Sequence, residues 1–167
     1  MKELHYDFHF SLNEWSILIS IFLGFLLVIL LPRRFTKKTM SIYLMCGIFF
    51  GFVFDHTLSI LPVRYYIIND SSSFEIMDFF SHVMYAPISY LFFYLYDLFH
   101  IKPNFTLLYI LGWAFVSVAI ERICGMIGIF HYQHGYTIYY SFVIYLLVIS
   151  IWIIFYRLIK EHGEKQY

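Results

Sequence analysis

Long apolar stretches alternate with short polar connections along the whole of this chain. Each stretch approaches the roughly 20 residues that a helix needs to cross a hydrocarbon core of about 30 Å. Membrane-spanning helices are therefore predicted over residues 15–31, 40–61, 75–99, 105–126 and 136–158. This pattern predicts an all-α fold: a polytopic integral membrane protein in which residues 1–167 form a single transmembrane domain, a bundle of about five helices.

Local signals support these boundaries. Ser11 with Glu14, and Ser72 with Glu75, have the spacing of a capping box, in which both side chains satisfy free N–H groups at a helix start. Pro87 lies inside the third predicted helix, so it either bends that helix or is accommodated by a neighbour. The sequence shows no internal repeat, direct or inverted, of the kind that secondary transporters commonly carry.

Lysine and arginine are distributed unequally between the two sides of the predicted bundle. One side carries Arg33, Arg34, Lys37, Lys38, Lys102, Arg157, Lys160 and Lys165, whereas the other carries Lys2 and Arg64. Short loops rich in these residues stay in the cytoplasm. The N-terminus is therefore predicted outside and the C-terminus in the cytoplasm.

Composition narrows the class of protein further. Hydrophobic residues make up 61% of the chain and charged residues 13%, and the mean hydropathy is +0.72. The formal net charge of zero argues against a nucleic-acid partner. At this length the predicted spans leave no room for a soluble catalytic domain, and the partners expected are the lipid bilayer and a second copy or another membrane protein. Cys46 and Cys124 fall at different predicted depths, so a disulfide between them is not expected.

Polar residues recur near the outer ends of the predicted helices, although charge within a membrane is costly. With the orientation above, one outer-side cluster is predicted from residues of the second, third and fourth spans: Asp55, His56, Asp78, His82, Glu121 and Arg122. Asp78 and His82 are four residues apart and so share one helical face. Asp55 and His56 lie about 100° apart around their helix and are expected to face different neighbours.

Three interpretations of this cluster remain open. In the first it provides packing electrostatics, with Arg122 paired with Asp55, Asp78 or Glu121. In the second it is a divalent metal site, because carboxylates and imidazoles suit zinc or manganese; the candidate ligands are His56, Asp78, His82 and Glu121. The sequence lacks a metalloenzyme spacing such as H-E-x-x-H. In the third the cluster relays protons or binds ions. No other cofactor is predicted.

Other polar and aromatic residues have simpler interpretations. Asp97 is expected at the inner interface, where Lys102 would neutralise it. His131 and His134, followed by Gly135, are typical of a turn. An outer aromatic belt at the membrane interface, which needs no ligand, is predicted from six tyrosines: Tyr65, Tyr66, Tyr132, Tyr136, Tyr139 and Tyr140.

Two segments carry a resemblance to a known group. The segment from Asn69 to Asp97 includes Met84-Tyr85-Ala86-Pro87, and a later one runs through Glu121 to Tyr140-Ser141. Together they resemble small, uncharacterised multi-span membrane proteins of Bacillus-like Firmicutes. In that group an aromatic residue commonly follows the glutamate, where this chain has Arg122. The resemblance covers roughly the second half of the chain and part of the second helix. It implies a bacterial cytoplasmic membrane and about five helices, and it implies no activity.

Three function classes follow. A non-enzymatic scaffold, assembly partner or envelope or sporulation component fits the short loops and the absence of a catalytic signature. An ion- or proton-handling subunit would use the outer-side Asp/His/Glu cluster. An intramembrane metal-dependent enzyme acting on lipid or peptide would need the metal site, and the sequence offers it least support.

Overall fold

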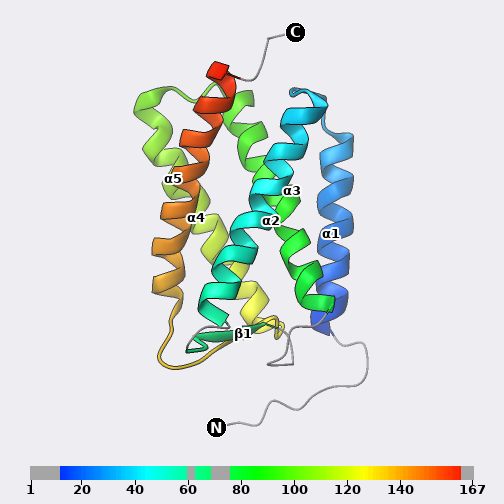
Figure 1. The fold of residues 1–167 in the computed structure, drawn as a ribbon, viewed down its shortest axis with the longest axis vertical. Coiled ribbons are helices and arrows are strands. Elements are labelled where there is room, and N and C mark those ends of the chain that lie inside the picture. Colours follow the sequence, from blue (N-terminus) through cyan, green and yellow to red (C-terminus); the bar gives the residue numbers. More distant parts are fainter. Residues whose placement is uncertain (1–11, 60–62, 69–75, 163–167) are drawn as a thin grey trace.

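The computed structural model describes residues 12–59, 63–68 and 76–162. Within them the chain is all-α apart from two short strands, as predicted. Five helices run up and down in turn (Figure 1): α1 Leu12–Leu30, α2 Lys37–Ser59, α3 Ile76–Leu98, α4 Pro103–Met126 and α5 Ile138–His162. Their bounds differ from the predicted ones by a few residues. The predicted caps at Ser11 and Ser72 lie outside the described residues.

Four of these helices, α1, α2, α4 and α5, are long and apolar enough to cross a membrane. The helix α3 is as long as α2 but is not one of these four, and it carries four tyrosines and a proline. It is the most buried helix, since α1 and α2 pack along it and its rings contact α4 and α5. The polar side chains of α3 are buried among these neighbours, as expected for the central helix of the bundle.

Pro87 of α3 is accommodated by a neighbour, which is one of the two outcomes predicted for it. It faces Gly24 of α1, where an added Cβ would lie only 2.5 Å from the proline Cγ. A side chain at residue 24 would therefore push α1 away from α3. The glycine allows the two helices to approach each other closely at the proline.

Two strands that the sequence analysis did not predict join the connections at one end of the bundle. The strands β1 (Tyr66–Ile68) and β2 (Phe130–Tyr132) pair antiparallel, with Tyr66 opposite Tyr132. The turn predicted at His131 and His134 is confirmed in part: His134 and Gly135 have positive φ, whereas His131 lies in β2. This two-stranded sheet ties the α2–α3 connection to the α4–α5 connection.

The other end of the bundle is held by Asp97 of α3, which is buried. Arg34 Nη2 lies 2.8 Å from its Oδ2, and Lys160 Nζ lies 2.5 Å from its Oδ1. The Tyr156 hydroxyl also donates to Oδ1 at 2.6 Å. The expected neutralisation by Lys102 is wrong, since Asp97 instead joins the α1–α2 connection, α3 and α5.

Stacked aromatic side chains fill the half of the bundle next to Asp97. Phe92 and Phe93 are fully buried. The ring of Phe93 stacks on Tyr43 of α2, with ring centres 3.9 Å apart, and the ring of Phe92 lies 5.3 Å from that of Trp152 of α5. Aromatic packing thus closes this half of the molecule.

Candidate functional site

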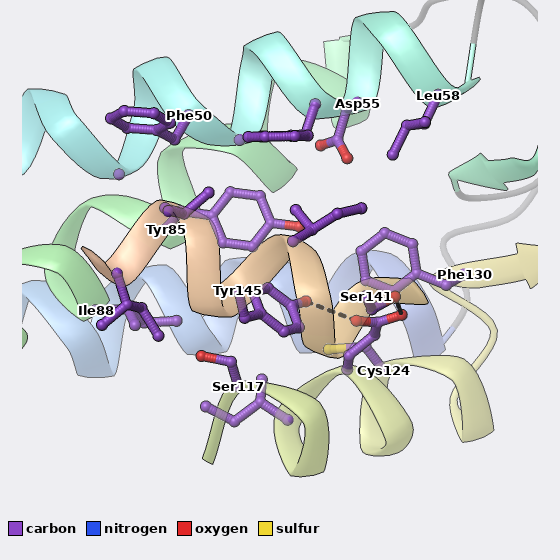
Figure 2. Close-up of a pocket in the computed structure, with 18 of the residues that line it drawn as sticks. Phe50, Asp55, Leu58, Tyr85, Ile88, Ser117, Cys124, Phe130, Ser141 and Tyr145 are labelled. Atoms are coloured by element: carbon purple, nitrogen blue, oxygen red, sulfur yellow. Dashed lines mark hydrogen bonds between the residues drawn. The ribbon is translucent and has the colours of Figure 1, made fainter. Parts of the chain in front are cut away.

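A cavity of about 130 Å³ occupies the other half of the bundle. It lies between α2 and α3 on one side and α4 and α5 on the other (Figure 2). Tyr66 and Tyr132 of the two strands line one end of it, and Trp113 and Trp152 line the end nearer Asp97. Two carboxylates, Asp55 and Glu121, lie in its walls.

Asp55 enters the cavity from the last turns of α2 and is almost fully buried. The Tyr66 hydroxyl of β1 donates to its Oδ1 at 2.6 Å, and His82 Nε2 of α3 lies 3.2 Å from its Oδ2. His82 is itself buried. The strand therefore donates a hydrogen bond to this carboxylate, and α3 places an imidazole beside its other oxygen.

Glu121 enters the cavity from α4 and accepts hydrogen bonds from three hydroxyl groups. Tyr132 of β2 donates at 2.5 Å and Ser141 of α5 at 2.6 Å, both to Oε1. Tyr145 of α5 donates to Oε2 at 2.7 Å. Hydroxyl donors satisfy a carboxylate in its charged form without adding positive charge. No ion pair of Glu121 with a lysine, arginine or histidine occurs among the described residues.

The strand tyrosines Tyr66 and Tyr132 stay protonated and can act as hydrogen-bond donors to the carboxylates. Burial, the charge of Asp55 and the hydrogen bond to it raise the pKa of Tyr66 well above its usual value. Burial and the hydrogen bond to Glu121 raise the pKa of Tyr132 in the same direction. Both hydroxyl groups therefore keep their protons, and each can donate to its carboxylate at any physiological pH.

Two further polar groups reach the cavity without a hydrogen-bond partner among the described residues. The Tyr85 side chain of α3 extends into the cavity (Figure 2). It is held there because α3 packs closely on α2: a Cβ added to Gly47 would meet the Tyr85 carbonyl oxygen at 2.2 Å. The indole Nε1 of Trp152 is buried and has no acceptor. A buried donor without an acceptor costs free energy.

The structure brings together some of the predicted cluster and separates the rest. Asp55 and His82 are in contact, and Glu121 lies in the opposite wall of the same cavity. Asp78 is buried on α3, but the carboxylate that contacts the His82 imidazole is that of Asp55. His56 is half-exposed and stacks on Phe52, 6.1 Å from the His82 ring.

The predicted pairing of Arg122 with a carboxylate is wrong. Arg122 is exposed and forms no ion pair within the described part of the chain. The physical reason is that Glu121 is already satisfied by three hydroxyls, which leaves Arg122 to reach the interface. Similarly, no group of three or more His, Cys, Asp or Glu among these residues could hold a metal ion. The zinc or manganese ligands proposed from sequence, His56, Asp78, His82 and Glu121, are thus not gathered there.

The aromatic-belt prediction is wrong for Tyr66 and Tyr132, the two tyrosines that contact the carboxylates. Tyr66 and Tyr132 bind the two carboxylates, and the Tyr136 hydroxyl lies 3.0 Å from that of Ser141. Tyr139 and Tyr140 are exposed, as residues of a belt would be. One signal in the sequence could have identified the site: Asp55 precedes Tyr66 by 11 residues, and Glu121 precedes Tyr132 by the same 11. In the structure, each carboxylate lies on a helix and its tyrosine lies on the strand that follows. The two strands pair with Tyr66 opposite Tyr132.

Comparison with known protein families, with characterised proteins and with solved structures found no match to this chain.

Proposed function

We propose that this chain is a multi-pass membrane protein that binds a small ligand in the cavity between Asp55 and Glu121. One observation carries the proposal: two buried carboxylates from different helices face a common cavity, and hydroxyls and one imidazole hold them. Concave, mostly apolar sites with a few converging polar groups are the usual form of ligand sites. The proposed protein is non-enzymatic, and the cavity is its ligand-binding site.

The packing of the inner half favours binding over passage through the chain. Beyond Trp152 the space is filled by the rings of Phe92, Phe93 and Tyr43. An ion entering the cavity would meet this aromatic layer before it reached Asp97. Through its described residues, a single copy of the chain therefore offers no path for ions from one side to the other. If it handles ions, it binds and releases them at the same side.

Orientation and location are part of the proposal. All five helices cross the membrane, with α3 as the shielded central span. The two-stranded sheet faces the outside of a bacterial cytoplasmic membrane. The cations of the α1–α2 connection and of the end of α5 support this orientation, because they lie together at the end opposite the sheet (Figure 1). The resemblance to Bacillus-like membrane proteins supports the location.

Native mass spectrometry of protein extracted gently from its own membrane tests the binding. Ser117 of α4 lines the cavity (Figure 2), so Ser117→Leu would fill part of it. The wild-type chain should carry a small bound mass that the Ser117→Leu variant lacks. Ser20→Leu, on an exposed position of α1, is the matched control and should retain that mass. A wild-type chain free of any adduct, or an adduct that survives Ser117→Leu, contradicts the proposal.

A further inference from the structure

We propose that the ligand of this cavity is a small organic cation, an ammonium group attached to a slender apolar body. This inference rests on the proposed function and names the class of molecule that the cavity selects. Three features of the cavity favour such a ligand: the charge of its walls, the chemistry of its lining side chains and its size.

The charge balance of the cavity is negative. Among the described residues, its lining includes Asp55 and Glu121 and no lysine or arginine. The Asp55 carboxylate has His82 beside it, whereas the donors to Glu121 within the described ranges are all hydroxyl groups. A buried charge without a counter-charge is costly, and a bound cation removes that cost. An anionic ligand would face two carboxylates instead, so the walls discriminate by the sign of the charge.

The lining side chains suit an organic cation better than a bare metal ion. Aromatic rings line the same cavity as the carboxylates, among them Tyr85, Tyr145, Trp113 and Phe54. Ring faces attract ammonium groups and also pack against apolar carbon, whereas a metal ion needs several ligands close together. The buried Trp152 Nε1–H lacks an acceptor, which points to an oxygen or a π-electron system of a bound molecule in the inner part of the cavity.

The size of the space limits the ligand to about one ring or a short alkyl chain. The cavity measures about 130 Å³. A dry, engineered cavity of roughly 150 Å³ in another protein is large enough for benzene. Along α5, Tyr145 and Trp152 are separated by a rise of about 10 Å, so the ammonium at Glu121 and the far end of the ligand can both be in contact with protein.

Such an ammonium could come from a free amine or from the headgroup of an ethanolamine lipid. The shared chemistry is a primary ammonium near the outer interface with apolar carbon behind it. Titrations in nanodiscs separate the two sources. If the ligand is a free amine, added amine binds equally well in discs of phosphatidylglycerol and in discs that also contain phosphatidylethanolamine. If the ligand is the lipid headgroup, phosphatidylethanolamine already occupies the site and weakens the binding of added amine.

The test uses the full chain with Trp15→Phe, so that tryptophan fluorescence reports on the two cavity tryptophans, Trp113 and Trp152. Three probes of equal size are titrated: 2-phenylethylammonium, 2-phenylethanol and phenylacetate. The ammonium should bind at least about tenfold more tightly than the alcohol, and the anion should not bind. Glu121→Gln should weaken ammonium binding about thirtyfold or more, because it removes the charge and retains the shape. Glu161→Gln, exposed at the opposite end, should leave binding unchanged.

The outcomes separate this inference from the proposed function. If the alcohol binds as well as the ammonium and Glu121→Gln has no effect, the cavity binds ligands but does not select cations, and the inference is overturned. The comparison of probes in the wild-type chain decides this even if Glu121→Gln does not fold. If no probe binds and the extracted protein carries no adduct sensitive to Ser117→Leu, the proposed function fails as well.

Discussion

At the scale of single residues, two of the buried carboxylates, one near each end of the bundle, have different kinds of partner. Asp97 is neutralised by two cations, Arg34 and Lys160. Glu121 is stabilised by three hydroxyls and no cation among the described residues. The first arrangement completes an internal ion pair, whereas the second leaves a charge available to a ligand. Under the proposed function, these partners distinguish the structural carboxylate of Asp97 from the ligand-binding carboxylate of Glu121.

The hydroxyl of Tyr145 should matter for stability because it satisfies one oxygen of Glu121. We expect Tyr145→Phe to lower the free energy of unfolding by about 1–3 kcal/mol, the cost of leaving a buried acceptor unsatisfied. Tyr139→Phe removes the same hydroxyl from an exposed residue of the same helix and should change little. Denaturant unfolding in detergent measures both. Equal effects of the two substitutions would show that the bond to Glu121 does not stabilise the fold.

At the scale of helices and strands, close contact between α2 and α3 positions the cavity. The sequence analysis identified both helices within a few residues, because their apolar runs are long. It did not identify the pair of strands, because segments of three residues carry almost no periodicity. The site depends on those strands, since they carry Tyr66 and Tyr132 to the carboxylates.

Gly47 should be intolerant of any side chain. We expect Gly47→Ala to destabilise the protein by about 1–3 kcal/mol, because the new methyl group would overlap the backbone of Tyr85. Gly112→Ala is the matched control: it lies in α4 with no atom within 4 Å of an added Cβ, and it should be neutral or stabilise by up to about 1 kcal/mol. Thermal unfolding in detergent measures the melting temperatures of both variants. Similar melting temperatures would contradict the close contact of α2 and α3.

At the scale of the whole molecule, the bundle consists of an α1–α2–α3 part and an α4–α5 part. Direct helix contacts are concentrated within these two parts. Asp97 and the aromatic layer join them at one end, and the strands join them at the other. The sequence predicted a bundle and placed Asp55 and Glu121 near the same end of it, where they line one cavity. It could not predict that these two attachments leave a cavity between them, because that depends on contacts between segments distant in the chain.

Cysteine labelling tests the orientation. Thr137→Cys lies beside the strands and Lys38→Cys lies at the opposite end, and both positions are exposed. An impermeant maleimide added to intact cells should label Thr137→Cys and leave Lys38→Cys unlabelled until the membrane is opened. The native Cys46 and Cys124 are buried and should contribute little background. The reverse labelling pattern would invert the orientation and place the cavity on the cytoplasmic side.

The pairing of Tyr66 with Tyr132 also has a consequence for biosynthesis. The ribosome releases β1 before α3 and α4 have been made, so β1 must wait for its partner until both later helices have been inserted. Closing so long a loop is slow compared with forming a helix. Because α5 also lines the cavity, its walls can close only after this last helix has been made. A ligand present in the membrane at that moment would be enclosed as the protein matures.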